Sequence, residues 1–125
     1  MSPRLLLVED DESIRAIARL GLERIGGWTV VPGACGEAAL RAARENGPLD
    51  AVLLDVMMPG MDGPSTLRRL RAEGLPARVP VVFLTAKAQS ADRRGLEGLG
   101  AAGVIAKPFD PLTLPDELAR LLSTP

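Results

Sequence analysis

Residues 49–63 read LDAVLLDVMMPGMDG, and this stretch decides the fold. The apolar run 51–54 has the length of a buried strand and is too short for a helix. Asp55 follows it directly, and the breaker-rich segment 58–63 then separates it from the next helical pattern. A strand that is apolar on both faces is typical of the centre of a parallel sheet with helices on both sides.

The same alternation of a short apolar run and a helix-period segment extends outward over the whole chain. We expect five strands, at 4–8, 28–31, 51–54, 79–84 and 103–106. We expect the five helices over 14–25, over 37–45, from Pro64 onward, over 90–99, and from about 110 or later to 122. Pro115 predicts either a kink in the last helix or the later start. The repeated unit predicts one doubly wound α/β domain, a five-stranded parallel sheet with helices on both faces and a core over about residues 4–122.

The composition excludes several classes of function. The 125 residues include 15 basic and 16 acidic side chains, a formal net charge of -1, and only three aromatic residues. These values describe a soluble globular domain and argue against direct nucleic-acid binding. One cysteine and no histidine exclude disulfides, zinc sites built on thiolate or imidazole, and a histidine general base. The apolar run 5–8 is too short for a signal peptide or a membrane span, so we expect a cytoplasmic protein without membrane contact.

Four of the predicted strands end on polar residues: Glu9 and Asp10, Asp55, Thr85, and Lys107. In an open parallel sheet, ligands bind outside the carboxyl ends of the strands, so we expect these side chains to converge. Clustered carboxylates repel one another unless a lysine and a divalent cation neutralise them, and oxygen donors select Mg²⁺ or Mn²⁺. The set is typical of phosphoryl transfer, with Asp55 as the nucleophile that becomes an acyl phosphate and with Thr85 and Lys107 binding phosphoryl oxygens.

Four stretches of the chain resemble the receiver domain of bacterial two-component response regulators. They are LLLVEDDESIR (5–15), LDAVLLDVMMPGMDG (49–63), VPVVFLTA (79–86) and AKPFDPLTL (106–114). The ordered separations of 45, 30 and 22 residues, from Asp10 through Asp55 and Thr85 to Lys107, make a chance match negligible. The resemblance covers 1–125 with no output domain in this chain, and it implies the flavodoxin-like strand order 2-1-3-4-5, of which receivers are a standard example.

Carried over to this chain, the family pattern makes Asp55 the phosphoacceptor. It implies that Asp10 binds Mg²⁺ directly, that Glu9 does so through water, and that Met57 supplies a backbone carbonyl to the metal. The expected metal ligands are therefore Glu9, Asp10, Asp55 and Met57, and Mn²⁺ is an alternative ion.

The resemblance also implies that Thr85 is the switch hydroxyl and that Lys107 is the phosphoryl-binding lysine, with a cis peptide bond before Pro108. One departure concerns Val104, three residues before Lys107, where the family commonly has an aromatic ring that moves inward on activation. The resemblance therefore does not carry the usual coupling between the switch hydroxyl and a ring over to this chain.

The implied partners are a sensor histidine kinase or a histidine phosphotransfer protein as phosphodonor, together with a downstream protein target. Phosphorylation would switch partner binding or self-association, and the resemblance allows a dimer through the predicted fourth helix, fifth strand and fifth helix. Two alternatives remain. A degenerate receiver that binds proteins without phosphorylation is kept open by Val104, and a phosphohydrolase with an aspartyl nucleophile would carry an acid where Met57 stands.

Overall fold

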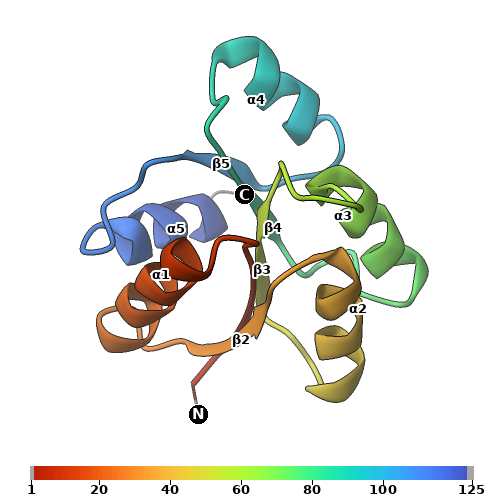
Figure 1. Cartoon of the computed structure of the whole chain (residues 1–125), viewed down its shortest axis with the longest axis horizontal. Helices are drawn as coiled ribbons and strands as arrows, with labels where there is room; N and C mark the ends of the chain where they lie inside the picture. The colour runs from red at the N-terminus through yellow and green to blue at the C-terminus, as the bar shows by residue number, and fades with distance from the viewer. Residues whose placement is uncertain (1, 124–125) are drawn as a thin grey trace.

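The computed structural model describes residues 2–123, which form one five-stranded parallel sheet flanked by helices (Figure 1). The strands are β1 (Arg4–Val8), β2 (Thr29–Gly33), β3 (Ala51–Asp55), β4 (Val81–Thr85) and β5 (Gly103–Ala106). Their spatial order is β2-β1-β3-β4-β5, and every adjacent pair is parallel. The doubly wound α/β fold and the predicted strand order are confirmed.

Five helices connect and follow the strands. They are α1 (Glu12–Arg24), α2 (Gly36–Glu45), α3 (Gly63–Ala72), α4 (Ser90–Glu97) and α5 (Leu114–Ser123). The later start of the last helix is confirmed, because α5 begins at Leu114 and Pro115 therefore lies in its first turn. Helix α4 ends two residues before the predicted boundary, with Gly98 at its C-cap.

The predicted strand boundaries shift by a few residues for local reasons. Strand β2 begins one residue late and continues through Pro32, which is tolerated there because β2 is an edge strand paired only with β1. Strand β4 begins at Val81 instead of 79, and the carbonyl of Pro80 still accepts a hydrogen bond from the Val52 amide at 3.0 Å.

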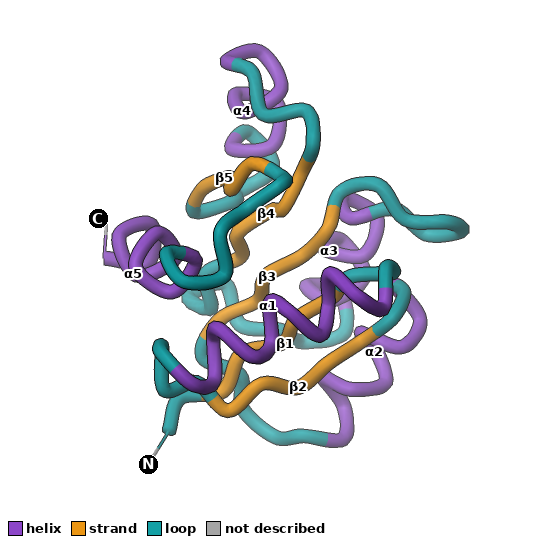
Figure 2. The backbone as a smooth tube through the Cα atoms, turned by 60° about the vertical axis from the view of Figure 1, so that its left-hand side comes forward, coloured by secondary structure: helices purple, strands orange, loops and turns teal. Residues whose placement is uncertain are grey.

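Alternating strand residues divide the core into two apolar layers. Leu5 and Leu7 of β1 pack with residues of α1 and α5, whereas Leu6 and Val8 pack with residues of α2, α3 and α4. Figure 2 shows α1 and α5 on one side of the sheet, with α2 and α3 on the other and α4 above β4 and β5. Burial on both faces explains why residues 5–8 of β1 and 51–54 of β3 are all apolar.

Candidate functional site

The polar residues that follow four strands meet at the carboxyl edge of the sheet, as the sequence predicts. Asp55 is the last residue of β3 and aligns with Leu84, next to Thr85 at the end of β4. The backbone amide of Lys107 donates to the Thr85 carbonyl at 2.8 Å, which extends the pairing of β5 with β4 past the end of the strands. The peptide bond between Lys107 and Pro108 is cis, as the resemblance implies.

Lys107 joins the two buried carboxylates of the site. Its Nζ donates to Oε1 of Glu9 at 2.8 Å and to Oδ1 of Asp55 at 3.2 Å. Glu9 and Asp55 are 0% and 1% exposed, so the ammonium group compensates charges that water does not reach. Burial disfavours the charged form of Lys107, but the hydrogen bond to Glu9 and the charges of Asp55 and Glu9 outweigh it and raise the pKa of the lysine.

Three carboxylates form an acidic cluster beside this lysine. Ligand atoms of Glu9, Asp10 and Asp55 lie within 4.8 Å of one another. Burial raises the pKa of Asp55 to about 7, and the nearby Asp10 carboxyl group and the charge of Glu9 act in the same direction. For Asp10, partial desolvation is outweighed by its interactions with the neighbouring Asp55 and Glu9 side chains and by the charge of Lys107, so its pKa lies below the usual value. The cluster therefore concentrates negative charge that one lysine does not balance.

One oxygen of Asp55 has no hydrogen-bond partner. Within the part of the chain that the structure describes, Oδ2 of Asp55 is the buried side-chain oxygen left unsatisfied. An unpaired buried carboxylate oxygen is costly, and it calls for a partner such as a cation or an incoming group. The all-oxygen donor set around it is the kind that Mg²⁺ and Mn²⁺ prefer.

Glu9 is held in place by two groups from the start of α1. The Asp11 amide donates to Oε2 of Glu9 at 3.1 Å, and Arg15 donates through Nη1 to the Glu9 backbone carbonyl at 2.9 Å. Asp11 also caps α1, since its Oδ1 accepts from the Ile14 amide at 2.9 Å. The sequence analysis missed Arg15, because a helical arginine carries no signal that its side chain folds back onto a strand end.

Thr85 ends β4, which lies on the side of β3 away from β1 and Glu9, and Met57 lines the same hollow as Thr85. The Thr85 hydroxyl is buried and accepts a hydrogen bond from the Lys87 amide at 2.9 Å. The Met57 side chain is 63% exposed and, together with Thr85 and Lys87, lines a hollow of about 310 Å³ below α4. Coordination of a metal by the Met57 carbonyl stays a prediction.

Gly63 sets the distance between α3 and the end of β3. A Cβ atom at this position would lie 2.4 Å from the carbonyl oxygen of Asp55, and the Gly63 amide donates to the Val56 carbonyl at 2.9 Å. Only glycine permits this approach of helix and strand, so the GMDG turn fixes the backbone that carries Asp55.

Comparisons with known proteins agree with this geometry. A profile of the response regulator receiver domain matches residues 5–119. The chain belongs to this family. It is 44% identical to the transcriptional regulatory protein CseB of Streptomyces avermitilis over 119 residues, which are 94% of this chain and 48% of that protein. It is 40% identical to the alkaline phosphatase synthesis transcriptional regulatory protein PhoP of Bacillus subtilis, over 89% of this chain and 45% of that protein.

Solved receiver structures share the whole fold. The chemotaxis response regulator CheY4 of Vibrio cholerae superposes with a TM-score of 0.88 at 30% identity, covering 98% of this chain and 100% of that one. The receiver domain of the hybrid histidine kinase CckA gives a TM-score of 0.75 at 35% identity, covering 96% of this chain and 99% of that one.

Family membership has direct consequences. Response regulator receiver domains are signalling domains of two-component systems and interact with histidine kinases, so the phosphohydrolase alternative is set aside. The chain spans about half the length of the curated relatives it matches. Across residues 2–123, no helix has the length and apolar character needed to cross a membrane.

Proposed function

We propose that Asp55 accepts a phosphoryl group from a phosphohistidine of a sensor histidine kinase or a phosphotransfer protein. The observation that carries the proposal is the buried Asp55 carboxylate, whose Oδ1 is bound by Lys107 and whose Oδ2 is unsatisfied. A bond forms between a carboxylate oxygen and phosphorus, the phosphorus–nitrogen bond breaks, and its electron pair leaves with the donor imidazole, which takes up a proton. These 125 residues include no histidine, so the phosphohistidine donor lies outside them.

We further propose that the acidic cluster holds Mg²⁺, or Mn²⁺ in its place. Asp10 and Asp55 are the direct carboxylate ligands, Glu9 acts through water, and Met57 contributes its backbone carbonyl. The proximity of the three carboxylates and the unsatisfied Oδ2 of Asp55 support this assignment. The bound cation supplies positive charge that offsets repulsion between the acidic side chains and the phosphoryl oxygens.

Thr85 and Lys107 bind the phosphoryl oxygens after transfer. Lys107 already donates to Asp55, so a short displacement of Nζ is enough to reach an oxygen on the new phosphoryl group. The Thr85 hydroxyl accepts from the Lys87 amide and keeps its own proton to donate. The full set of polar groups favours this function over a phosphorylation-independent receiver, which remains the second candidate because Val104 lacks a ring.

The surface beside Lys107 suits a protein phosphodonor. Ile17 and Leu20 of α1 are 47% and 55% exposed, and Leu112, five residues after Lys107, is 68% exposed. These side chains line adjoining hollows, one of which includes Lys107, so an apolar face leads up to the site. We expect Ile17→Ser to take phosphate from a small-molecule donor at the normal rate but from its kinase more slowly. Equal rates from the kinase would contradict this docking surface.

The receiver core is proposed to cover about residues 4–122 and to act through a downstream protein target. Self-association through α4, β5 and α5 is a second form of output for the same switch. The relatives named above are transcriptional regulators, whereas the near-neutral charge of this chain supports a receiver that does not itself contact nucleic acid. Direct DNA binding by the isolated chain in a gel-shift assay would overturn that part of the proposal.

Intact-mass spectrometry after incubation with acetyl phosphate tests the central claim. We expect one phosphoryl adduct on the wild type in Mg²⁺, little in EDTA, and none on Asp55→Asn. Asp116→Asn, which removes a carboxylate from the exposed surface of α5, is the matched control and should be modified like the wild type. An adduct that persists on Asp55→Asn would overturn Asp55 as the acceptor, and absence of the adduct from the wild type would leave the phosphorylation-independent receiver as the better account.

A further inference from the structure

Arg93 of α4 connects two segments that flank the site. Its Nε donates to the Ala88 carbonyl at 2.7 Å, and its Nη1 donates to the Val104 carbonyl at 3.0 Å. Ala88 lies in the loop between β4 and α4, and Val104 lies in β5. One half-buried guanidinium group therefore joins the loop 86–89, α4 and the edge strand β5.

The Val104 carbonyl is available for this contact because β5 is an edge strand. It pairs only with β4, so part of its backbone faces away from any strand partner. The Val104 side chain is 2% exposed and packs in the apolar layer with Phe83 and Leu96. Because the Val104 side chain stays in this apolar layer beside Leu96 of α4, the polar link between β5 and α4 is made by the Val104 carbonyl and Arg93.

A run of direct contacts leads from this guanidinium group to the site. The Thr85 hydroxyl accepts from the Lys87 amide at 2.9 Å, and Lys87 immediately precedes Ala88, whose carbonyl accepts from Arg93. Thr85 at one end is the residue proposed to bind the phosphoryl group. Val104 at the other end is the position where an aromatic switch is missing.

Helix α4 has few other attachments. It is eight residues long, its N-cap Gln89 makes no side-chain capping bond, and Leu96 is its buried residue. Figure 1 shows α4 at the β4 and β5 end of the sheet, set apart from the other helices. The planar guanidinium, held by two hydrogen bonds, is thus a main constraint on how α4 sits against β5.

We infer that Arg93 is a positioning residue that transmits the state of Thr85 to α4 and β5, in place of the missing aromatic ring. The inference rests on the proposed phosphorylation of Asp55. When the Thr85 hydroxyl turns to the phosphoryl group, the loop 86–89 moves, and the two carbonyls that Arg93 bridges change their separation. Helix α4 shifts with the guanidinium, so the surface offered to a target changes. Arg93 is then an internal link and not a free charge for pairing between two copies of the chain.

Hydrogen–deuterium exchange over residues 86–106, before and after loading with acetyl phosphate in Mg²⁺, tests this role. In the wild type we expect phosphorylation to change the exchange rates of the loop, α4 and β5 several-fold. Arg93→Met should still form the Asp55 adduct but lose the change in α4 and β5, and Arg93→Lys should retain part of it. Arg94→Met removes a neighbouring exposed arginine of the same helix and should respond like the wild type.

A double mutant separates transmission from simple support of α4. If Arg93 acts downstream of Thr85, then Thr85→Ala combined with Arg93→Lys should lose no more of the response than Thr85→Ala alone. Additive losses, or a full response in Arg93→Met, would overturn the inference. The mass of each sample reports the Asp55 adduct independently. Absence of the adduct from the wild type defeats the proposed function, whereas an adduct with an unaltered Arg93→Met response defeats only the role of Arg93.

Discussion

The two ends of the sheet contrast in how they treat polar groups. At the carboxyl end, Glu9, Asp55 and Lys107 are drawn together out of water, and one carboxylate oxygen is left unsatisfied. At the amino end, the charged groups stay on the surface and the interior is apolar. The buried charges of the carboxyl end lower stability but hold the polar groups in fixed positions. The apolar interior of the amino end stabilises the fold.

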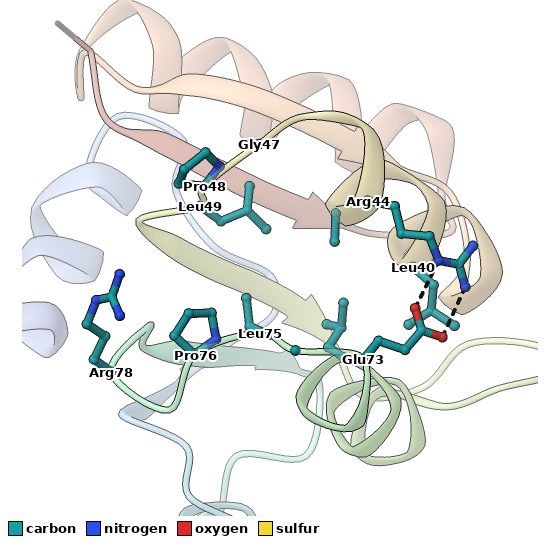
Figure 3. Close-up of a pocket in the computed structure, with 12 residues that line it drawn as sticks. Leu40, Arg44, Gly47, Pro48, Leu49, Glu73, Leu75, Pro76 and Arg78 are labelled. Carbon is teal, nitrogen blue, oxygen red and sulfur yellow. Dashed lines mark hydrogen bonds and ion pairs between the residues drawn. The ribbon is translucent and has the colours of Figure 1, made fainter.

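The amino end also contains a well-formed hollow, of about 330 Å³, between α2 and α3. Figure 3 shows Leu40, Leu49 and Leu75 directed into it, with Arg44 and Glu73 paired across one end. Within the part of the chain that the structure describes, its lining includes no cluster of carboxylates. The buried charges therefore distinguish the candidate functional site from this hollow, which has a similar size but, among the described residues, no such charges.

The largest expected change in stability comes from the apolar end. Leu70 of α3 is 2% exposed, contacts the core layer below α2 and α3, and borders the hollow. Leu70→Ala should lower the free energy of unfolding by about 2–5 kcal/mol through lost burial and a cavity. Urea denaturation measures the change.

The same variant sharpens the contrast between the two ends. At temperatures where Leu70→Ala remains folded, its Asp55 adduct should form at the wild-type rate, because no group of the carboxyl end has changed. Leu70→Met is the volume-conserving control and should cost less than about 1.5 kcal/mol. A strong loss of phosphorylation in folded Leu70→Ala would show that the ends are energetically coupled.

The next largest effect is an increase in the free energy of unfolding, and it is expected for a substitution at the carboxyl end. The pKa of Asp55 is about 7 in the folded protein, because burial disfavours the carboxylate, and it is near the ordinary value of 3.8 in the unfolded chain. Its favourable contribution is complete below pH 3.8 and is lost as the pH rises through 7. Without divalent ions, Asp55→Asn should be more stable than the wild type by on the order of 3 kcal/mol at pH 8, a difference that shrinks towards pH 4.

Thermal or urea unfolding at several pH values, in EDTA, measures this difference. Adding Mg²⁺ at pH 8 should stabilise the wild type more than Asp55→Asn, since the cation favours the ionised carboxylate. A stability difference that does not vary between pH 4 and pH 8 would mean that burial does not raise the pKa of Asp55. The carboxyl end would then not differ from the amino end in this respect.

The two ends also differ in how far the sequence predicts them. Apolar runs and the breakers of 58–63 suffice for the strands and for the convergence of Asp55 with Lys107, because both follow from parallel topology. Arg15 and Arg93 could not be predicted. Each reaches a backbone carbonyl several residues away, and that contact depends on how a helix packs, which periodicity does not encode.

A smaller decrease in the free energy of unfolding is expected when the Lys107 ammonium group beside the buried carboxylates is removed. Lys107→Gln removes the charge that faces Glu9 and Asp55, and loss of its hydrogen bonds to charged groups should lower the free energy of unfolding at pH 7 by about 2 kcal/mol. Acidic pH should reduce the loss, because protonated carboxylates need no counter-charge. Lys87→Gln removes an exposed lysine of the neighbouring loop and should change stability by less than about 0.5 kcal/mol in urea denaturation. Equal losses in both variants would contradict the special position of Lys107.

The smallest effect on the free energy of unfolding is expected for the ion pair of Arg44 and Glu73 at the amino end. Arg44 donates through Nε and Nη2 to the two carboxylate oxygens of Glu73, both at 3.0 Å, and Arg69 adds a contact at 3.4 Å. The hydrogen bonds to Arg44 lower the pKa of Glu73, so the pair stabilises the fold above the ordinary glutamate pKa and loses this effect as the pH falls. Water and salt screen these exposed groups, so a double-mutant cycle of Arg44→Gln and Glu73→Gln should give a coupling that disappears in about 1 M salt. Arg44→Gln should lower the free energy of unfolding less than Glu73→Gln does, because Arg69 still contacts the Glu73 carboxylate. A coupling that persists in salt and matches the loss in Lys107→Gln would mean that both ends bury charge, and the contrast between them would fail.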